Sequence, residues 1–129
     1  MTEKDVISQF GITVRDFNGD LMPDELGFYD PKTNVAFLSD KLSRKERLKV
    51  LLHELGHMQH TSAEYKNARI RCENEADRCM IHHLVKDAIL QLDDVKDFNY
   101  LKFMEFYNFK TVTEELMVKE EFEKLVGNY

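Results

Sequence analysis

The chain has 129 residues, of which 43 % are hydrophobic and 33 % are charged, and its formal net charge is −6 at pH 7. This length and apolar content suit one domain with a single core, which we expect to span residues 1–129. The apolar runs are too short for a membrane span, and the N-terminus lacks the apolar core of a signal peptide. The negative charge disfavours direct contact with nucleic acid or anionic membrane, so we expect no such partner. Cys72 and Cys79 are seven residues apart, about 10 Å within one helix, which is too far for a disulfide. Reduced thiols suit a cytoplasmic protein, which we therefore expect.

Residues 1–40 are predicted to be mainly strands. Residues 10–16 alternate apolar and polar side chains, as a half-buried strand does, and an Asn-Gly turn follows them. Residues 26–38 have the pattern of two short strands around the loop DPKTN, which predicts a hairpin. With a short helix at residues 3–9, this part of the chain forms a small three-stranded sheet, antiparallel or mixed.

Residues 43–92 are predicted to form two helices. Ser43 and Glu46 have the spacing of a capping box, which begins a helix over about residues 44–60. Apolar side chains follow at steps of three and four residues and make one stripe: Leu48, Leu51, Leu52, Leu55 and Met58. A second amphipathic helix is predicted for about residues 64–92.

Residues 93–129 are predicted to be helical, with amphipathic segments at residues 97–108 and 113–126. Acidic side chains far outnumber the lysines here, whereas a DNA-binding surface needs the opposite sign. We expect this part to pack over the preceding helices. A docking face for a protein partner is the alternative.

The segment KVLLHELGHMQH contains two histidines, His53 and His57, four residues apart, with Glu54 directly after the first. Residues four apart lie on one face of a helix, so both imidazoles can bind one metal ion. Zinc lowers the pKa of a water, and a carboxylate placed like that of Glu54 can take the proton. The alternative is a surface helix that carries two histidines by chance.

Zinc needs a third protein ligand. A histidine six residues after the second would be one source, but that position is Ala63. The segment CENEADRCM is the other source, because Glu73 and Asp77 are four residues apart and share a helix face. Glu73 can complete the coordination, while Asp77 accepts the outer N–H of a ligand histidine. Ala76 is small enough for two helices to approach, and Glu75, about 200° from Glu73, should face solvent.

These residues resemble the ImmA/IrrE family of bacterial and phage metallopeptidases. HELGH, His60 just after it, ENEAD at residues 73–77, and a hairpin that ends in NVAFLSDKL carry the resemblance, which covers residues 25–92. It implies an α+β fold in which the small sheet packs on a zincin-like (gluzincin-like) helix pair, followed by C-terminal helices.

The resemblance also implies a role for each motif residue. His53, His57 and Glu73 correspond to zinc ligands, and Glu54 to the general base. Asp77 corresponds to the hydrogen-bond acceptor of a ligand histidine, which we expect to be His53.

Other roles in the predicted reaction are less closely tied to the motif. We rank His60 first as the donor that stabilises the oxyanion, with Tyr65 or Arg69 as alternatives. We expect the strand at residues 34–38 to be an edge strand that pairs with an extended peptide substrate.

The expected function is that of a zinc-dependent endopeptidase which cleaves a helix-turn-helix repressor encoded on a prophage or mobile element. The alternative is a zinc-containing binding or toxin module that sequesters a regulator without proteolysis. Replacing Glu54 by Gln would distinguish the two, because it should abolish the function of a peptidase and change little in a binding module. A metal-free helical protein is a third interpretation.

Overall fold

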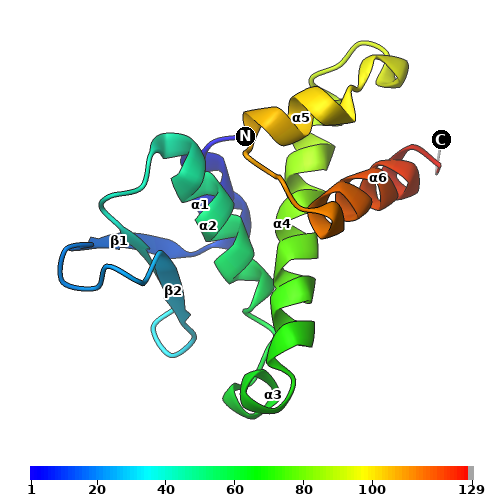
Figure 1. Cartoon of the computed structure of the whole chain (residues 1–129). Coiled ribbons are helices and arrows are strands. Elements are labelled where there is room, and N and C mark those ends of the chain that lie inside the picture. The colour runs from blue at the N-terminus through cyan, green and yellow to red at the C-terminus, as the bar shows by residue number, and fades with distance from the viewer. Residues whose placement is uncertain (128–129) are drawn as a thin grey trace.

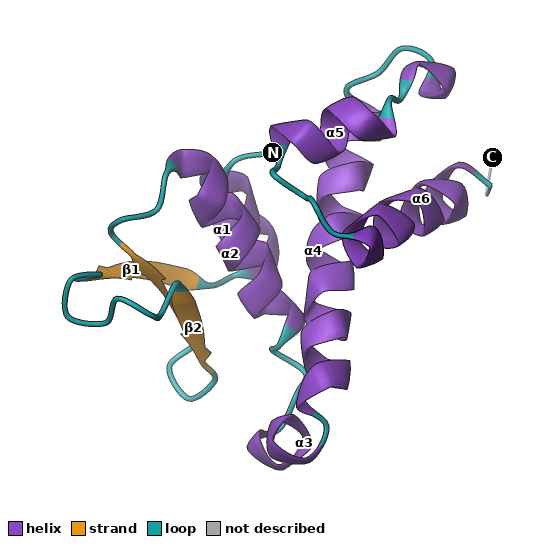
Figure 2. Ribbon diagram, viewed as in Figure 1, coloured by secondary structure: helices purple, strands orange, loops and turns teal. Residues whose placement is uncertain are grey.

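A short helix and a small sheet come first along the chain, and helices dominate after them (Figures 1 and 2). The computed structural model describes residues 1–127. Its elements are α1 (Glu3–Phe10), β1 (Thr13–Phe17), β2 (Gly27–Asp30), β3 (Val35–Ser39), α2 (Arg44–Gly56), α3 (Ser62–Asn67), α4 (Arg69–Leu90), the 3-10 turn η1 (Val95–Asp97), α5 (Tyr100–Phe106) and α6 (Val112–Val126). The predicted α+β class, with C-terminal helices, is confirmed.

The sheet has the strand order β1-β3-β2. β1 pairs with β3 in parallel and β2 pairs with β3 antiparallel, so the sheet is mixed. The predicted hairpin is present, and Asn34 in its loop has the left-handed φ of 58° that asparagine tolerates. The expectation that residues 34–38 form an edge strand is wrong, because β3 is paired on both sides. The free edges belong to β1 and β2.

The sheet packs on α2 through small and aliphatic side chains. Ala36 and Leu38 of β3 are completely buried. At Gly27 in β2, an added Cβ would lie 2.7 Å from the Val50 side chain of α2. The glycine therefore lets the edge strand lie directly against the helix that carries the two motif histidines.

The predicted capping box starts α2. The Ser43 hydroxyl accepts a hydrogen bond from the Glu46 amide, and the Glu46 carboxylate accepts one from the Ser43 amide, each at 3.2 Å. The leucines of the predicted stripe are buried, whereas Met58 is 38 % exposed. Met58 lies outside the helix, because α2 ends at Gly56 instead of residue 60 and the chain turns there.

The second predicted helix, residues 64–92, is broken in two. Ala68 leaves the helical conformation, with φ −138° and ψ 50°, and separates α3 from α4. The Thr61 hydroxyl accepts a hydrogen bond from the Glu64 amide and gives α3 its own N-terminus. The break turns α3 across the end of α4 (Figure 1), which a continuous helix could not do.

The C-terminal helices match the predicted segments closely: α5 is shorter than predicted at both ends, and α6 begins one residue earlier than predicted. α6 packs on α4, and the buried Glu121 accepts hydrogen bonds there from Arg78 (3.3 Å) and His82 (3.1 Å). The His83 ring packs edge-on against Phe10 of α1. Both histidines of α4 thus have structural partners. Within residues 1–127, no helix combines the length and the apolar character that crossing a bilayer requires.

Replacing Gly56 by Ala tests the contact between α2 and α4. An added Cβ would lie 2.6 Å from Ala76 Cα and 3.1 Å from Cys79 Cβ, so the helices must separate. We expect a loss of about 1–3 kcal/mol in the free energy of unfolding, measured by urea titration. The same change at an open helical position stabilises by about 1 kcal/mol, so a more stable variant would contradict the contact.

Candidate metal centre

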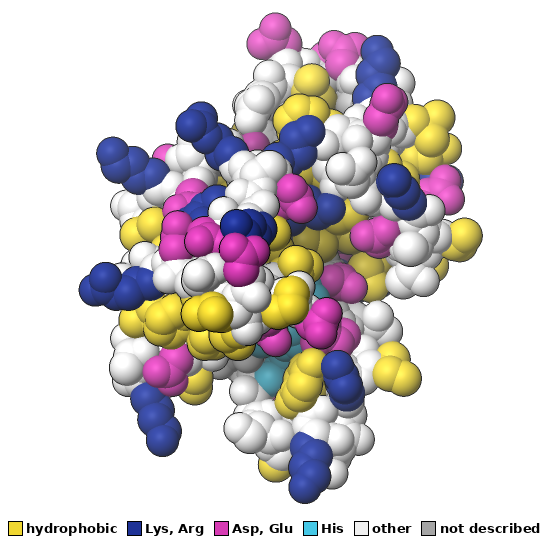
Figure 3. Space-filling model, turned by 60° about the vertical axis from the view of Figure 1, so that its left-hand side comes forward, with side chains coloured by type: hydrophobic (Ala, Val, Ile, Leu, Met, Phe, Trp, Pro, Cys, Tyr) yellow, Lys and Arg dark blue, Asp and Glu magenta, His cyan; other side chains and the backbone are white. Residues whose placement is uncertain are grey.

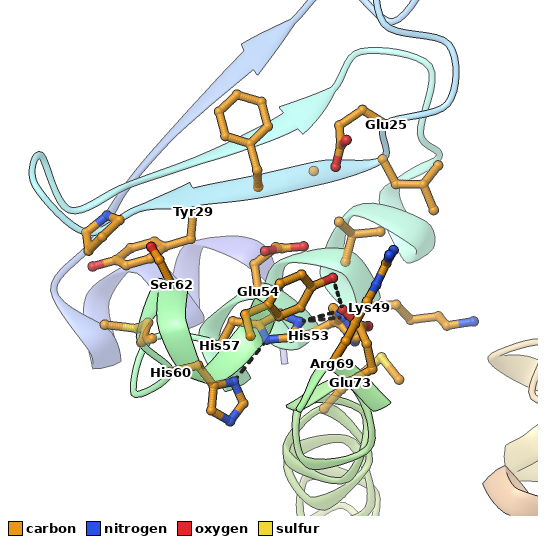
Figure 4. A pocket seen from close by; sticks show the side chains of 18 of the residues that line it. Glu25, Tyr29, Lys49, His53, Glu54, His57, His60, Ser62, Arg69 and Glu73 are labelled. Atoms are coloured by element: carbon orange, nitrogen blue, oxygen red, sulfur yellow. Dashed lines mark hydrogen bonds and ion pairs between the residues drawn. The ribbon is translucent and has the colours of Figure 1, made fainter. Parts of the chain in front are cut away.

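Two helices bring three candidate ligands to one point. His53 projects from the last turn of α2, His57 is the residue that caps the C-terminus of α2, and Glu73 projects from the second turn of α4 (Figure 4). The two Nε2 atoms are 3.2 Å apart, His53 Nε2 lies 3.1 Å from Glu73 Oε2, and His57 Nε2 lies 3.3 Å from Glu73 Oε1. One ligand atom from each residue can be chosen so that all three lie within 4.8 Å of one another.

These closest separations are of the size found around zinc, and Glu73 meets the two nitrogens through different oxygens. Four ligands about 2.0–2.1 Å from a tetrahedral ion lie about 3.3 Å from one another. Two imidazole nitrogens and a carboxylate also repel one another at this distance when each presents a lone pair. The chemistry of the three groups therefore fits a cation held between them.

The close approach of α2 and α4 has a local cause. Gly56 lies directly against the backbone of Ala76, with no room for a side chain between them. Gly56 directly precedes the candidate ligand His57, and Ala76 lies about one turn after Glu73 on α4. Ala76 therefore allows the close helix approach that its small size predicted. Gly56 is the equally small residue that faces it from α2.

Asp77 lies behind His53. Its Oδ1 is 2.8 Å from His53 Nδ1, on the side of the ring away from Glu73. Burial acts to lower the pKa of His53, but the hydrogen bond and charge of Asp77 outweigh it and the pKa is raised. Donation from Nδ1–H leaves a lone pair on Nε2, the nitrogen that faces the other candidate ligands.

Glu54 lies in a poorly hydrated part of the site. Burial raises its pKa to about 7, the positive charge of His53 opposes the increase, and the charge of Glu73 adds to it. A carboxylate with a pKa near neutrality can both accept and return a proton at pH 7. The position and the pKa of Glu54 both suit a general base.

A cleft of about 1000 Å³ opens over these residues. One wall is β2 with the loop before it, including Glu25 and Tyr29, and the opposite wall is formed by α3 and the start of α4, including Tyr65 and Arg69. Figure 3 shows histidine side chains at the bottom of this hollow, with acidic and apolar side chains around it. The open edge of β2 borders the cleft.

Tyr65 reaches the candidate ligands from α3. Its hydroxyl donates a hydrogen bond of 2.8 Å to Glu73 Oε1, which raises the pKa of Tyr65, and its ring packs edge-on against His57. The Arg69 guanidinium lies 5.7 Å from the centre of the Tyr65 ring. Tyr65 reaches this position because the chain breaks at Ala68, and no local pattern in the sequence marks that break.

His60 occupies a different place from the one expected of an oxyanion donor. Its Nδ1 lies 3.1 Å from Nδ1 of His57, and its Nε2 lies 2.7 Å from the Glu75 carboxylate. Both ring nitrogens therefore have partners on the outer side of His57. Glu75 is 45 % exposed, in keeping with the predicted solvent-facing position, but its contact with His60 was not foreseen.

A comparison with known protein families supports a metallopeptidase-type role for this site. Residues 7–122 match the model of a peptidase family described as the IrrE N-terminal-like domain, and the chain belongs to that family. The resemblance found in the motif residues is thus confirmed. No curated protein and no solved structure matches the chain significantly.

Replacing Glu54 by Gln should stabilise the metal-free protein at high pH. The pKa of Glu54 is about 7 in the folded state against 4.5 ordinarily, so folding is favoured below pH 4.5 and that contribution is lost as the pH rises through 7. The difference is about 2.5 pKa units, and each unit corresponds to about 1.4 kcal/mol, so the gain for the variant at pH 8 should be about 3 kcal/mol. Near pH 4.5 the gain should fall below about 0.5 kcal/mol.

Urea unfolding of chelator-treated protein at pH 4.5, 6 and 8 measures this difference. A variant no more stable than the wild type at pH 8 would show that Glu54 is not desolvated. The half-exposed Glu64, replaced by Gln, serves as the control and should give the same small effect at each pH.

Proposed function

We propose that the protein is a zinc-dependent endopeptidase. His53, His57 and Glu73 hold the ion, and the convergence of their ligand atoms at 3.1–3.3 Å is the observation that carries the proposal. Zinc, when bound, supplies a Lewis acid that polarises a peptide carbonyl and activates water. The position of these ligands at the bottom of a cleft makes a role in catalysis more consistent with the geometry than a purely structural ion.

Glu54 acts as the general base. Its carboxylate takes a proton from the attacking water and returns that proton to the leaving amine, which its pKa of about 7 suits. Asp77 holds His53 in the orientation that presents Nε2 to the ion.

Tyr65 is the better candidate for the oxyanion donor. Both residues line the cleft, but the Tyr65 hydroxyl lies 2.8 Å from Glu73 Oε1, whereas both nitrogens of His60 have partners on the outer side of His57. When substrate enters, the hydroxyl can exchange Glu73 for the developing negative charge on the carbonyl oxygen. We therefore assign to Tyr65 the role for which His60 ranked first on the sequence.

The substrate binds as an added strand on β2 instead of the strand first expected. The Ser39 amide donates to the Leu26 carbonyl at 2.9 Å. In an antiparallel pair the hydrogen-bonding direction alternates along each strand, so Gly27 and Tyr29 direct their backbone groups to the free edge. An extended peptide can pair there and cross the cleft beside His53, which suits cleavage within a chain.

The substrate we propose is a helix-turn-helix repressor of a prophage or mobile element, which places the reaction in the cytoplasm. The resemblance to the ImmA/IrrE family motivates this choice. Charge supports it, because solvent-accessible carboxylates gather on the last two helices, at Glu105, Glu114, Glu115 and Glu123, and suit a basic DNA-binding partner.

Replacing Glu54 by Gln should abolish cleavage and preserve zinc. The variant keeps the three ligands but loses proton transfer, so we expect a fall of about 10²–10⁴ in kcat for the repressor encoded beside the gene. Metal analysis of protein purified without added zinc should give about one zinc per chain for both forms. Glu64→Gln is the matched control and should cleave like the wild type.

Biological function retained by the Glu54→Gln variant would instead favour the zinc module that sequesters a regulator without proteolysis. Absence of zinc from the wild type would contradict both functions.

Replacing Tyr65 by Phe should lower kcat by about 10–1000-fold and change KM less than about threefold, because the lost donor acts on the transition state. Steady-state kinetics with a peptide from the repressor measures both constants, and a zinc titration checks that the metal is retained. Tyr107→Phe, outside the cleft, serves as the control. A Tyr65→Phe variant with unchanged kcat would exclude the role.

A further inference from the structure

The candidate ligand His57 has an outward contact that the zinc motif does not explain. His57 Nδ1 lies 3.1 Å from His60 Nδ1, and His60 Nε2 lies 2.7 Å from Glu75 Oε2 (Figure 4 shows the two histidines). The other oxygen of Glu75 lies 3.8 Å from Arg71 Nε, one turn earlier on α4. A row of side chains therefore leads from the ligand cluster to the surface.

When the rings of His57 and His60 are both neutral, only one arrangement of their protons satisfies the hydrogen bonds from His57 through His60 to Glu75. The ionised carboxylate of Glu75 can only accept, so the proton of His60 lies on Nε2 and its Nδ1 is an acceptor. His57 must then donate from Nδ1, which leaves the lone pair of its Nε2 directed at His53 and Glu73. This is the tautomer that binding a metal through Nε2 requires.

Burial makes the inner part of the row effective. The His60 side chain is only 4 % exposed, so water competes little for its hydrogen bond with His57. The His57 ring packs edge-on against His60 on one side, with centres 5.3 Å apart, and against Tyr65 on another, with centres 5.5 Å apart. The ring is thus held by packing as well as by the hydrogen bond.

The geometry of α4 explains why a bridging residue is needed. Asp77 contacts His53 directly from the side of α4 that faces α2. Glu75 is two residues earlier, about 200° around the helix, and cannot reach a ring of α2 in the same way. His60, in the turn after α2, spans that gap.

We propose that His60 and Glu75 are positioning residues that lock His57 in the tautomer with a free Nε2 and thereby set the affinity of the site for zinc. The proposal rests on the zinc site proposed above. His60 would then do for His57 what Asp77 does for His53, which is to accept a hydrogen bond from Nδ1–H.

Zinc affinity in a set of full-length variants tests the row. The dissociation constant is measured by competition with a chelator of known affinity. His60→Ala should weaken binding by about 10–100-fold and Glu75→Gln by a smaller factor. His60→Gln should stay within about threefold of the wild type, because its amide offers an acceptor and a donor in place of the two ring nitrogens. Glu64→Gln, which removes another carboxylate beside Arg71, is the matched control and should bind like the wild type.

Nitrogen NMR of the zinc-loaded protein gives a readout that a merely structural role would not move. The wild type should show a His57 Nδ1–H proton protected from exchange, and His60→Ala should lose that protection while circular dichroism reports a folded protein. Unchanged zinc affinity and unchanged protection in His60→Ala would overturn the proposal. So would a His60→Gln variant as weak as His60→Ala, since the imidazole would then only fill space.

The outcomes also separate this proposal from the proposed function. If the protein binds zinc, the variants behave as expected and no repressor is cleaved, the peptidase function fails and the positioning role stands. If the wild type binds no zinc, both fail.

Discussion

The contact between Gly56 of α2 and Ala76 of α4 is the constraint on which the rest of the structure depends. An added methyl group at Gly56 would lie 2.6 Å from the Ala76 backbone, so the two helices are as close as their main chains allow. This separation is what brings Glu73 within 3.1–3.3 Å of two imidazole nitrogens on the neighbouring helix. If α2 and α4 were farther apart, Glu73 could not reach the two imidazoles, and the same sequence motif would form no metal site.

The site costs stability in the absence of an ion. Glu54 is desolvated enough to raise its pKa to about 7, and the charge of Glu73 adds to that increase. The two carboxylates repel one another in a poorly hydrated place and are held there by apolar packing, in which Leu51, Leu52 and Leu84 are completely buried. This electrostatic cost is what a bound cation would relieve.

The elements around α2 and α4 each hold one side of the cleft. Gly27 lets the edge strand β2 pack against α2, so an open row of backbone groups lies beside the histidines. On the far side of α4, the buried Glu121 of α6 joins Arg78 and His82 and fixes the helix from behind. α3 turns back at Ala68 and carries Tyr65 to Glu73. The sheet, α3 and the C-terminal helices therefore all act on one helix pair.

The sequence by itself determined the features that depend on local geometry. The spacing of four between His53 and His57, and between Glu73 and Asp77, places each pair on one face of its helix because the α-helix has a fixed period. The capping box at Ser43 and the hairpin around the DPKTN loop are likewise local, and the structure contains both.

Contacts between distant parts of the chain were decided only by the tertiary structure. The strand order, which makes β2 the edge bordering the cleft, depends on how β1 meets β3 across an intervening hairpin. The partners of His60 and Tyr65 depend on where α2 ends and where α3 breaks from α4, since a change of direction at one residue redirects every side chain after it. Periodicity specifies which face of a helix a residue occupies, but only packing decides what that face meets.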